Sequence, residues 1–240
     1  LIINTFWHSQ TILFLKRSNR FFPIIEPILK KNNIPNDFKY LVIIESGLQN
    51  VTSPSGAKGY WQFMKKTALD FNLEISNDVD ERYHLEKSTQ AACEYLNIAF
   101  LKFDSWILAA AAYNMGVYGL EKQITKQKSN NYFNLALNSE TSRYIFRLLA
   151  VKQISSKPEH FGFQITNTDL YNPFQTKLIH VDSSITNLVD FSFKLNTNYK
   201  MLKLLNPWMI SNKLENLSEK QYLIKIPINN YDKEIINDSI

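Results

Sequence analysis

The stretch IPNDFKYLVIIESGLQNVTSPSGAKGYWQFM, residues 34–64, contains a helical pattern that places an acidic residue on the apolar side. The residues that recur at the spacing of one helical face are Phe38, Leu41, Val42 and Glu45. A carboxylate on a face that packs into a core costs free energy unless it is paired or protonated. A polar turn and an aromatic and amide cluster, YWQF, follow the helix. The stretch therefore predicts one acid at the base of a loop-lined, aromatic-walled site.

The ends of this helix have their own signals. Asn36 or Asp37, directly after Pro35, can cap its beginning, and Gly47 can end it. We expect the polar loop 46–59 to begin there.

Composition indicates a globular protein with one large domain or two unequal ones. The chain has 240 residues, of which 45% are hydrophobic and 13% aromatic, enough for a substantial core. Its net charge of +5, with a pI near 9.1, fits an anionic polymer as partner, but it fits a solvated basic surface as well. The basic residues form no clustered stripe, so we expect no nucleic-acid partner.

No metal, cofactor or disulfide is expected. The single cysteine, Cys93, lies in a helical run and is interpreted as a buried small hydrophobe rather than a reactive thiol. The histidines share no ligand spacing; they are His8, His84, His160 and His180.

Apolar runs are too short for a membrane span. Residues 1–10 show no basic segment and no cleavage site of a signal peptide, so an exported form would begin after its targeting segment.

Helical periodicity continues to about residue 155 and then stops. Residues 120–137 are less regular, and the segment 156–177 contains Pro158, Gly162 and Pro173. The sequence predicts a helical bundle followed by a small strand–helix–helix–strand unit. The first expected helices of the bundle are 5–17, 24–31, 38–46 and 65–72. Three more follow: one capped by Ser88 and running to about 102, one capped by Asp104 or Ser105 and ended by Gly116, and one that begins at Asn138 or Ser139. The small unit is expected to have strands 178–181 and 222–227 around helices 185–193 and 197–205.

Five segments, in order, resemble the lysozyme-like lytic transglycosylases, most closely their membrane-bound type D subgroup. They are ES at 45–46, SPSGAKGYWQFM at 53–64, DERYHLEKSTQAA at 80–92, AAYNMG at 111–116 and ETSRYIFRLLA at 140–150. One departure is Tyr60, where the family usually has leucine. The resemblance implies a mainly α, goose-type lysozyme-like catalytic domain over residues 1–165, a linker over 166–177, an α+β module over 178–230 and a tail over 231–240.

The resemblance also implies the chemistry. Such enzymes cleave the β-1,4 bond between N-acetylmuramic acid and N-acetylglucosamine in peptidoglycan and form a 1,6-anhydro end. The family's catalytic acid falls on Glu45, which the periodicity had already singled out; the alternative is a structural buried glutamate. Candidates for a second carboxylate, Glu74 and Asp80, have no pattern that places them opposite Glu45. A single acid suffices if the acetamido group of the substrate assists.

The family's substrate-binding positions fall on Ser46, Gln62, Tyr113, Asn114 and Tyr144. An amide such as Gln62 suits an N-acetyl group. The alternative roles are a helix end for Ser46, packing for the two tyrosines and helix capping for Asn114. We interpret Trp61 and Phe63 as core residues, and Asp80 and Arg82 as a structural ion pair.

Residues 178–230 resemble a LysM module, although Asp182-Ser183-Ser184 replaces the usual Gly-Asp turn. LysM modules bind glycans that contain N-acetylglucosamine, so this C-terminal module would tether the enzyme to its substrate. The alternative is a module that only packs.

Taken as a lytic transglycosylase, the protein is expected in the periplasm or cell envelope, as a monomer acting on peptidoglycan strands. Membrane association would need a lipid anchor or signal segment absent from this chain. The alternatives are a goose-type hydrolase of the same fold and a non-catalytic peptidoglycan-binding protein.

Overall fold

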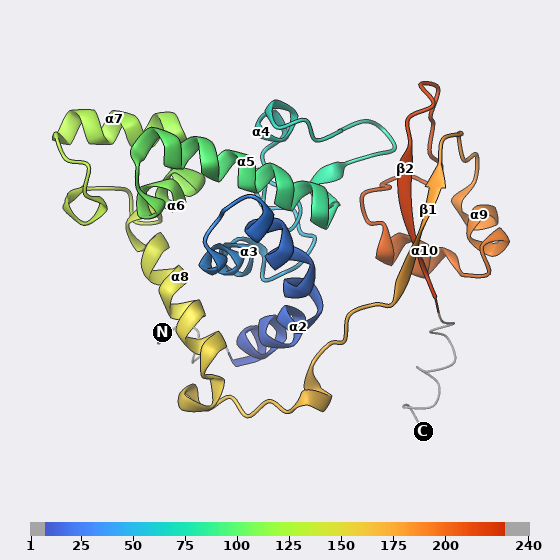
Figure 1. The fold of residues 1–240 in the computed structure, drawn as a ribbon, viewed down its shortest axis with the longest axis horizontal. Coiled ribbons are helices and arrows are strands. Elements are labelled where there is room, and N and C mark those ends of the chain that lie inside the picture. Colours follow the sequence, from blue (N-terminus) through green and yellow to red (C-terminus); the bar gives the residue numbers. More distant parts are fainter. Residues whose placement is uncertain (1–7, 229–240) are drawn as a thin grey trace.

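A computed structural model describes residues 8–228, and the expected helix start at residues 5–7 and the tail 231–240 lie outside them. The chain forms a helical unit and then a small unit with strands, as predicted (Figure 1). The elements of the helical unit are α2 (His8–Lys31), α3 (Lys39–Ser46), α4 (Lys65–Asp70), α5 (Leu85–Phe103), α6 (Trp106–Met115), α7 (Val117–Gln127) and α8 (Thr141–Ser156), with short 3-10 turns at Asn36–Phe38, Glu81–Tyr83, Tyr132–Asn134, Pro158–Phe161 and Asn167–Asp169.

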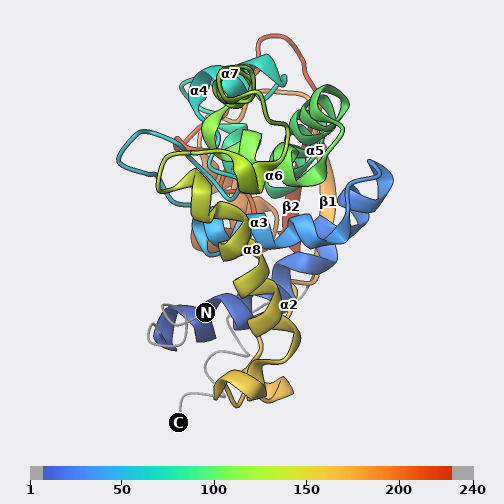
Figure 2. The same cartoon turned by 90° about the vertical axis from the view of Figure 1, so that its left-hand side faces the viewer.

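Helix α3 lies inside the helical unit, where α8 packs against it (Figures 1 and 2). Its Leu41 and Val42 are fully buried, because the apolar face found in the sequence is turned into the core. Gly47 ends the helix in a left-handed conformation, as predicted. The predicted cap was wrong: Pro35 precedes a 3-10 turn without a side-chain cap, and Asp37 instead pairs with Lys152 at 2.5 Å.

Helix α6 carries the AAYN segment and packs between α5, α7 and α8. Its alanines are almost completely buried, because small side chains let neighbouring helices approach closely. Ser105 caps it, with its hydroxyl accepting from the Leu108 N–H at 3.3 Å, and Gly116 ends it. Both ends agree with the sequence prediction.

One continuous helix, α2, replaces the two short helices expected at 5–17 and 24–31. Pro23 and Pro27 lie inside it, each removing a backbone N–H donor. Both prolines are exposed, whereas Ile25 and Leu29 are fully buried. Tertiary packing therefore outweighs the local cost of the prolines.

Two further local predictions were wrong. Residues 117–127, partly expected to be irregular, form α7, whose apolar stripe is narrow and centres on the buried Leu120. Helix α5 begins at Leu85, with His84 rather than Ser88 at its N-cap. Ser88 is fully buried inside the helix, and its hydroxyl donates to the His84 carbonyl at 2.8 Å.

The C-terminal module has the predicted order of elements. Strands β1 (Thr176–Val181) and β2 (Tyr222–Pro227) pair antiparallel, with Ile179 opposite Ile224. Helix α10 (Tyr199–Leu205) packs against β2, and helix α9 (Leu188–Lys194) packs against α10. The domain boundaries remain a prediction, since Val79 of the helical unit belongs to the hydrophobic cluster of this module.

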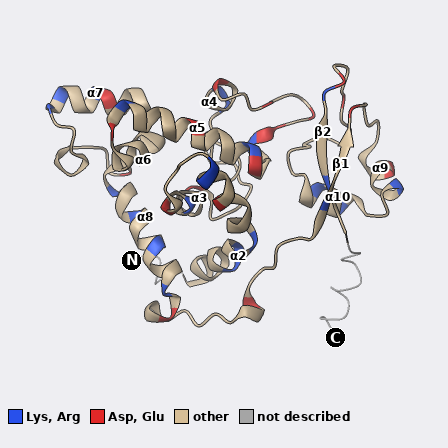
Figure 3. Ribbon diagram, viewed as in Figure 1, with Lys and Arg blue, Asp and Glu red and all other residues tan. Residues whose placement is uncertain are grey.

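Basic and acidic positions are interspersed over the described ribbon (Figure 3). Within residues 8–228, helices with enough length and apolar character to cross a membrane are absent.

Two glycines in the loop between α3 and α4 give a matched test of packing. Gly56 and Gly59 both have positive φ, +88° and +82°, but a Cβ on Gly59 would lie 1.9 Å from the carbonyl oxygen of Arg82, while one on Gly56 would meet open space. We expect Gly56→Ala to cost about 1 to 2 kcal/mol from backbone strain alone. Gly59→Ala should cost at least about 2 kcal/mol more, from overlap with backbone. Urea unfolding measures both, and equal costs would contradict this close contact.

Candidate active site

Glu45 lies at the C-terminal end of α3, the helix that packs against α8. The hydroxyl of Tyr144, on α8, donates a hydrogen bond to Oε1 of Glu45. Tyr144 is 1% exposed and Glu45 is half-buried, so this bond lies at the edge of the core. The structure thus brings together two of the predicted site residues, 99 positions apart in the sequence.

Burial raises the pKa of Glu45 from 4.5 to about 7, because loss of solvation disfavours the carboxylate. The Tyr144 hydrogen bond and the charge of Arg147 lower this pKa, and the charge of Glu140 raises it. Near neutral pH a large fraction of Glu45 is therefore protonated and able to donate a proton. The hydrogen-bond donor to Glu45 is a neutral phenol rather than a fixed cation.

Tyr113, on α6, faces the same region. Its hydroxyl donates to the Trp61 carbonyl at 2.8 Å, and its ring packs edge-on against Trp61 and Phe63. Burial raises the pKa of Tyr113, and the charge of Glu45 raises it further. Tyr113 therefore stays neutral and joins α6 to the loop that holds Gln62.

Gln62 lies in the loop of residues 50–63, which we call the Gln62 loop, and has a positive φ of 52°. Its amide nitrogen donates to the carbonyls of Gly59 at 2.7 Å and Val51 at 3.1 Å. Because both partners can only accept, the orientation of the amide is fixed. The loop thus satisfies the donors of Gln62, while its side-chain oxygen accepts no hydrogen bond within residues 8–228.

Asn114 joins the end of α6 to the beginning of α8 rather than contacting Glu45. Its side-chain oxygen accepts from the Thr141 hydroxyl at 2.7 Å, and its nitrogen donates to Glu140 at 3.0 Å. Thr141 lies one helical turn before Tyr144, so Asn114 helps to fix the register of α8.

Ser46 is used by its own helix end. Its hydroxyl donates to the Val42 carbonyl at 3.0 Å and accepts from the Gln49 N–H at 3.4 Å. Ser46 is 8% exposed, which favours the alternative of a structural role.

Both sequence candidates for a second carboxylate are used elsewhere. Asp80 is buried and forms an ion pair with Arg82 at 2.7 Å, as the sequence had suggested for this pair. Glu74 accepts a hydrogen bond from Tyr222 of the C-terminal module at 2.9 Å.

Sequence reasoning missed Glu140 and Arg147, which bias the pKa of Glu45 in opposite directions. They stand four positions before and three positions after Tyr144, so helical spacing places both beside it. Arg147 also donates to the Ile44 carbonyl at 3.1 Å, next to the acid. The spacing of Glu140 and Arg147 from Tyr144 was therefore the sequence signal that could have identified them.

Comparison with known families identifies both parts of the chain. Residues 22–136 match the transglycosylase SLT domain, and residues 177–230 match the soluble lytic transglycosylase C-terminal LysM-like domain. This chain contains an SLT domain. The match includes Glu45, Gln62, Tyr113 and Asn114 but ends before Tyr144.

Among curated proteins, the SLT-domain chain is homologous to membrane-bound lytic murein transglycosylase D of Escherichia coli (strain K12). The two are 31% identical over 147 residues, which cover 59% of this chain and 32% of the relative. The chain therefore spans about a third of the length of that curated relative.

Two solved structures are also similar. The 70 kDa soluble lytic transglycosylase of Escherichia coli gives a TM-score of 0.48 at 18% identity, covering 67% of this chain and 28% of that one. An inactive mutant of the lytic transglycosylase Slt of Pseudomonas aeruginosa gives 0.47 at 17% identity, covering 65% and 28%.

The raised pKa of Glu45 predicts a pH-dependent stability difference between the wild type and Glu45→Gln. The folded protein disfavours the ionised acid, so wild-type stability falls as pH rises from 4.5 through about 7, whereas glutamine does not titrate. Urea unfolding should show the variant gaining up to about 3 kcal/mol relative to the wild type between pH 4 and pH 8.

The matched control is Glu159→Gln, at an exposed glutamate far along the chain. It shows the effect of removing an exposed carboxylate under the same conditions. A stability difference for Glu45→Gln that does not change with pH would contradict the raised pKa.

Proposed function

We propose that this protein is a peptidoglycan lytic transglycosylase. It cleaves the β-1,4 bond between N-acetylmuramic acid and N-acetylglucosamine and leaves a 1,6-anhydro-muramic end. The observation that carries the proposal is the acid Glu45, whose pKa is raised to about 7 and which Tyr144 holds, within an SLT domain. The name of the curated relative, a lytic murein transglycosylase, supports murein as substrate.

In the first step, the protonated Glu45 donates its proton to the glycosidic oxygen while the bond from that oxygen to the anomeric carbon breaks. The carbonyl oxygen of the muramic acetamido group attacks the anomeric carbon and forms an oxazolinium ring, so no second protein carboxylate is needed. N-acetylglucosamine leaves with the proton on its 4-oxygen. Glu45 is now a carboxylate.

In the second step, this carboxylate takes the proton of the muramic 6-hydroxyl, and the 6-oxygen attacks the anomeric carbon. The bond from the anomeric carbon to the acetamido oxygen breaks, which restores the acetamido group and closes the anhydro ring. Glu45 regains its proton, and no water is consumed. A pKa near 7 suits a group that must both donate and accept within one cycle.

The remaining site residues receive roles from their contacts. The fixed side-chain oxygen of Gln62 can accept from an acetamido N–H. Tyr144 stabilises the carboxylate formed in the first step, since its hydroxyl already donates to Glu45. Tyr113 positions the Gln62 loop, and Asn114 positions α8. Ser46 serves the helix end.

The envelope is the proposed location, because the relatives are named as membrane-bound or murein enzymes. Peptidoglycan strands are the proposed partner. The mechanism needs neither a cofactor nor a metal ion, and it needs only a monomer.

A goose-type hydrolase is the second candidate function, and the position of Glu140 supports it. This exposed carboxylate influences Glu45 electrostatically and could orient a water molecule in place of the 6-hydroxyl. The hydrolase product keeps one water more than the anhydro product. A non-catalytic binding protein would have no use for an acid poised near neutral pH.

Mass spectrometry of digested peptidoglycan tests the proposal. The wild type should release anhydro-muropeptides, and Glu45→Gln should reduce the rate by at least about 100-fold, because glutamine cannot transfer the proton. Glu159→Gln should digest like the wild type. Products with reducing ends would favour the hydrolase, and an inert wild type would favour the binding protein. Release of anhydro-muropeptides by Glu45→Gln at a rate close to that of the wild type would show that the acid is assigned wrongly.

A further inference from the structure

The C-terminal module is fixed to the helical unit by residues 74–84, which we call the docking segment. Val79 of this segment is 1% exposed and belongs to the hydrophobic cluster of the module. Its backbone forms an isolated antiparallel β-bridge with Met209 of the module. On either side of it, the Asp80 N–H donates to the Trp208 carbonyl and the Ile210 N–H donates to the Asp78 carbonyl, each at 2.8 Å. The docking segment therefore completes the core of the module.

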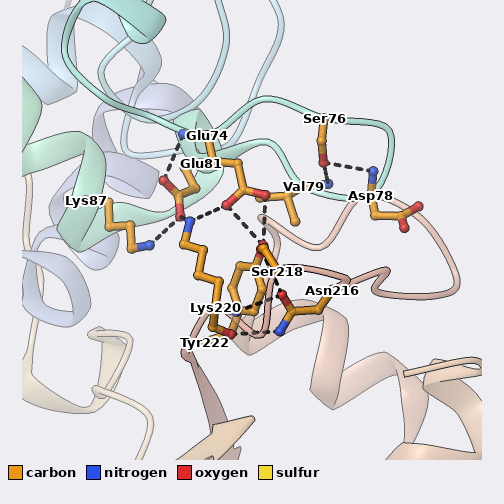
Figure 4. Close-up of polar contacts among 10 residues, drawn as sticks. All are labelled: Glu74, Ser76, Asp78, Val79, Glu81, Lys87, Asn216, Ser218, Lys220 and Tyr222. Carbon is orange, nitrogen blue, oxygen red and sulfur yellow. Dashed lines mark hydrogen bonds and ion pairs between the residues drawn. The ribbon is translucent and has the colours of Figure 1, made fainter. Parts of the chain in front are cut away.

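Polar contacts reinforce this attachment (Figure 4). Glu74 accepts from the Tyr222 hydroxyl and pairs with Lys220, which also lies 3.7 Å from Glu81. The side chain of Asp78 accepts from the Glu215 N–H at 3.0 Å. The carboxylates stand on the docking segment and the donors on the module, so attraction between the units favours the docked state.

The other side of the docking segment supports the Gln62 loop. Asp80 orients Arg82 through two hydrogen bonds, and Arg82 donates to the Phe63 carbonyl at 3.4 Å. Gly59 touches the Arg82 backbone so closely that no side chain fits between them. The loop also hydrogen-bonds Tyr83, whose carbonyl accepts from Asn50 at 3.2 Å.

The connection between the units is held along α2. The Tyr171 N–H donates to the Lys16 carbonyl at 3.2 Å, and Arg20 donates to the Asn172 carbonyl at 2.9 Å. The guanidinium of Arg20 also lies over the Phe174 ring, 4.1 Å from its centre. The module is thus attached at both its docking surface and its entry segment.

We propose that the C-terminal module holds the Gln62 loop in its binding conformation, with Val79 and Arg82 as positioning residues. The support runs from the module through Val79 and Asp80 to Arg82, and from there to Phe63 and Gly59. Packing is then the module's task, rather than tethering through a freely hanging domain. The part of this inference that concerns catalysis rests on the proposed function; the part that concerns loop order does not.

Hydrogen–deuterium exchange of the full chain tests the support directly. Val79→Asp places a charge in the core of the module and should release the docking segment. We expect exchange in peptides that cover residues 51–64 to rise by about tenfold or more, with α8 unchanged. The matched control is Leu217→Asp, which introduces the same charge on the same module at a side chain that is 88% exposed.

Asp78→Ala is a milder second variant, in case Val79→Asp fails to fold. It removes the acceptor of the Glu215 N–H and should give a smaller rise in the same peptides. If exchange at residues 208–215 rises while residues 51–64 stay protected, the module does not support the loop. If residues 208–215 stay protected in both variants, Val79 and Asp78 do not hold the module.

Measurement of KM and kcat on soluble glycan fragments distinguishes loss of loop support from a general loss of protein stability. A released loop should raise KM several-fold, because Gln62 binds substrate. Because the pKa of Glu45 is about 7, we expect kcat of the wild type to fall as the pH rises through that value. Release of the loop should leave this fall in place, because the Glu45–Tyr144 contact is untouched. A shift of that pH profile would contradict a role limited to positioning. Inactivity of the wild type would remove the proposed function and leave the exchange result standing.

Discussion

The site depends on one constraint, the partial burial of a carboxylic acid against a neutral hydroxyl. Helix α3 carries Glu45 on the face that also buries Leu41 and Val42, so the acid is half-buried at the edge of the core. Its pKa rises because lost solvation outweighs the Tyr144 hydrogen bond and the charge of Arg147, which both limit the rise. An acid that exchanges its proton near neutral pH follows from this packing.

The surrounding structure holds the Glu45–Tyr144 contact in place. Gly47 stops α3 directly after the acid, and Asn114 ties α6 to the beginning of α8, the helix that presents Tyr144. The Gln62 loop approaches from another side and is fixed by Tyr113. On this view, the helical unit supplies the acid and its hydrogen bond, and the C-terminal module steadies the loop that would bind the sugar.

Much of this could be predicted from the sequence, because the relevant signals are local. Helical period placed Glu45 on the apolar face, and Gly47 and Gly116 marked the helix ends. What failed depends on contacts between distant segments. The two prolines of α2 are outweighed only by packing that a local pattern does not contain, and the docking function of residues 74–84 appears only when the module is in place. Glu140 and Arg147 were within reach of helical spacing from Tyr144.

The most direct test is an NMR titration of the side-chain carboxyl carbon of Glu45, assigned by its absence in Glu45→Gln. We expect a midpoint near 7. In Tyr144→Phe the midpoint should move upward, because the hydroxyl stabilises the ionised form. A wild-type midpoint near 4.5, the ordinary value for glutamate, would show that Glu45 is not a desolvated acid.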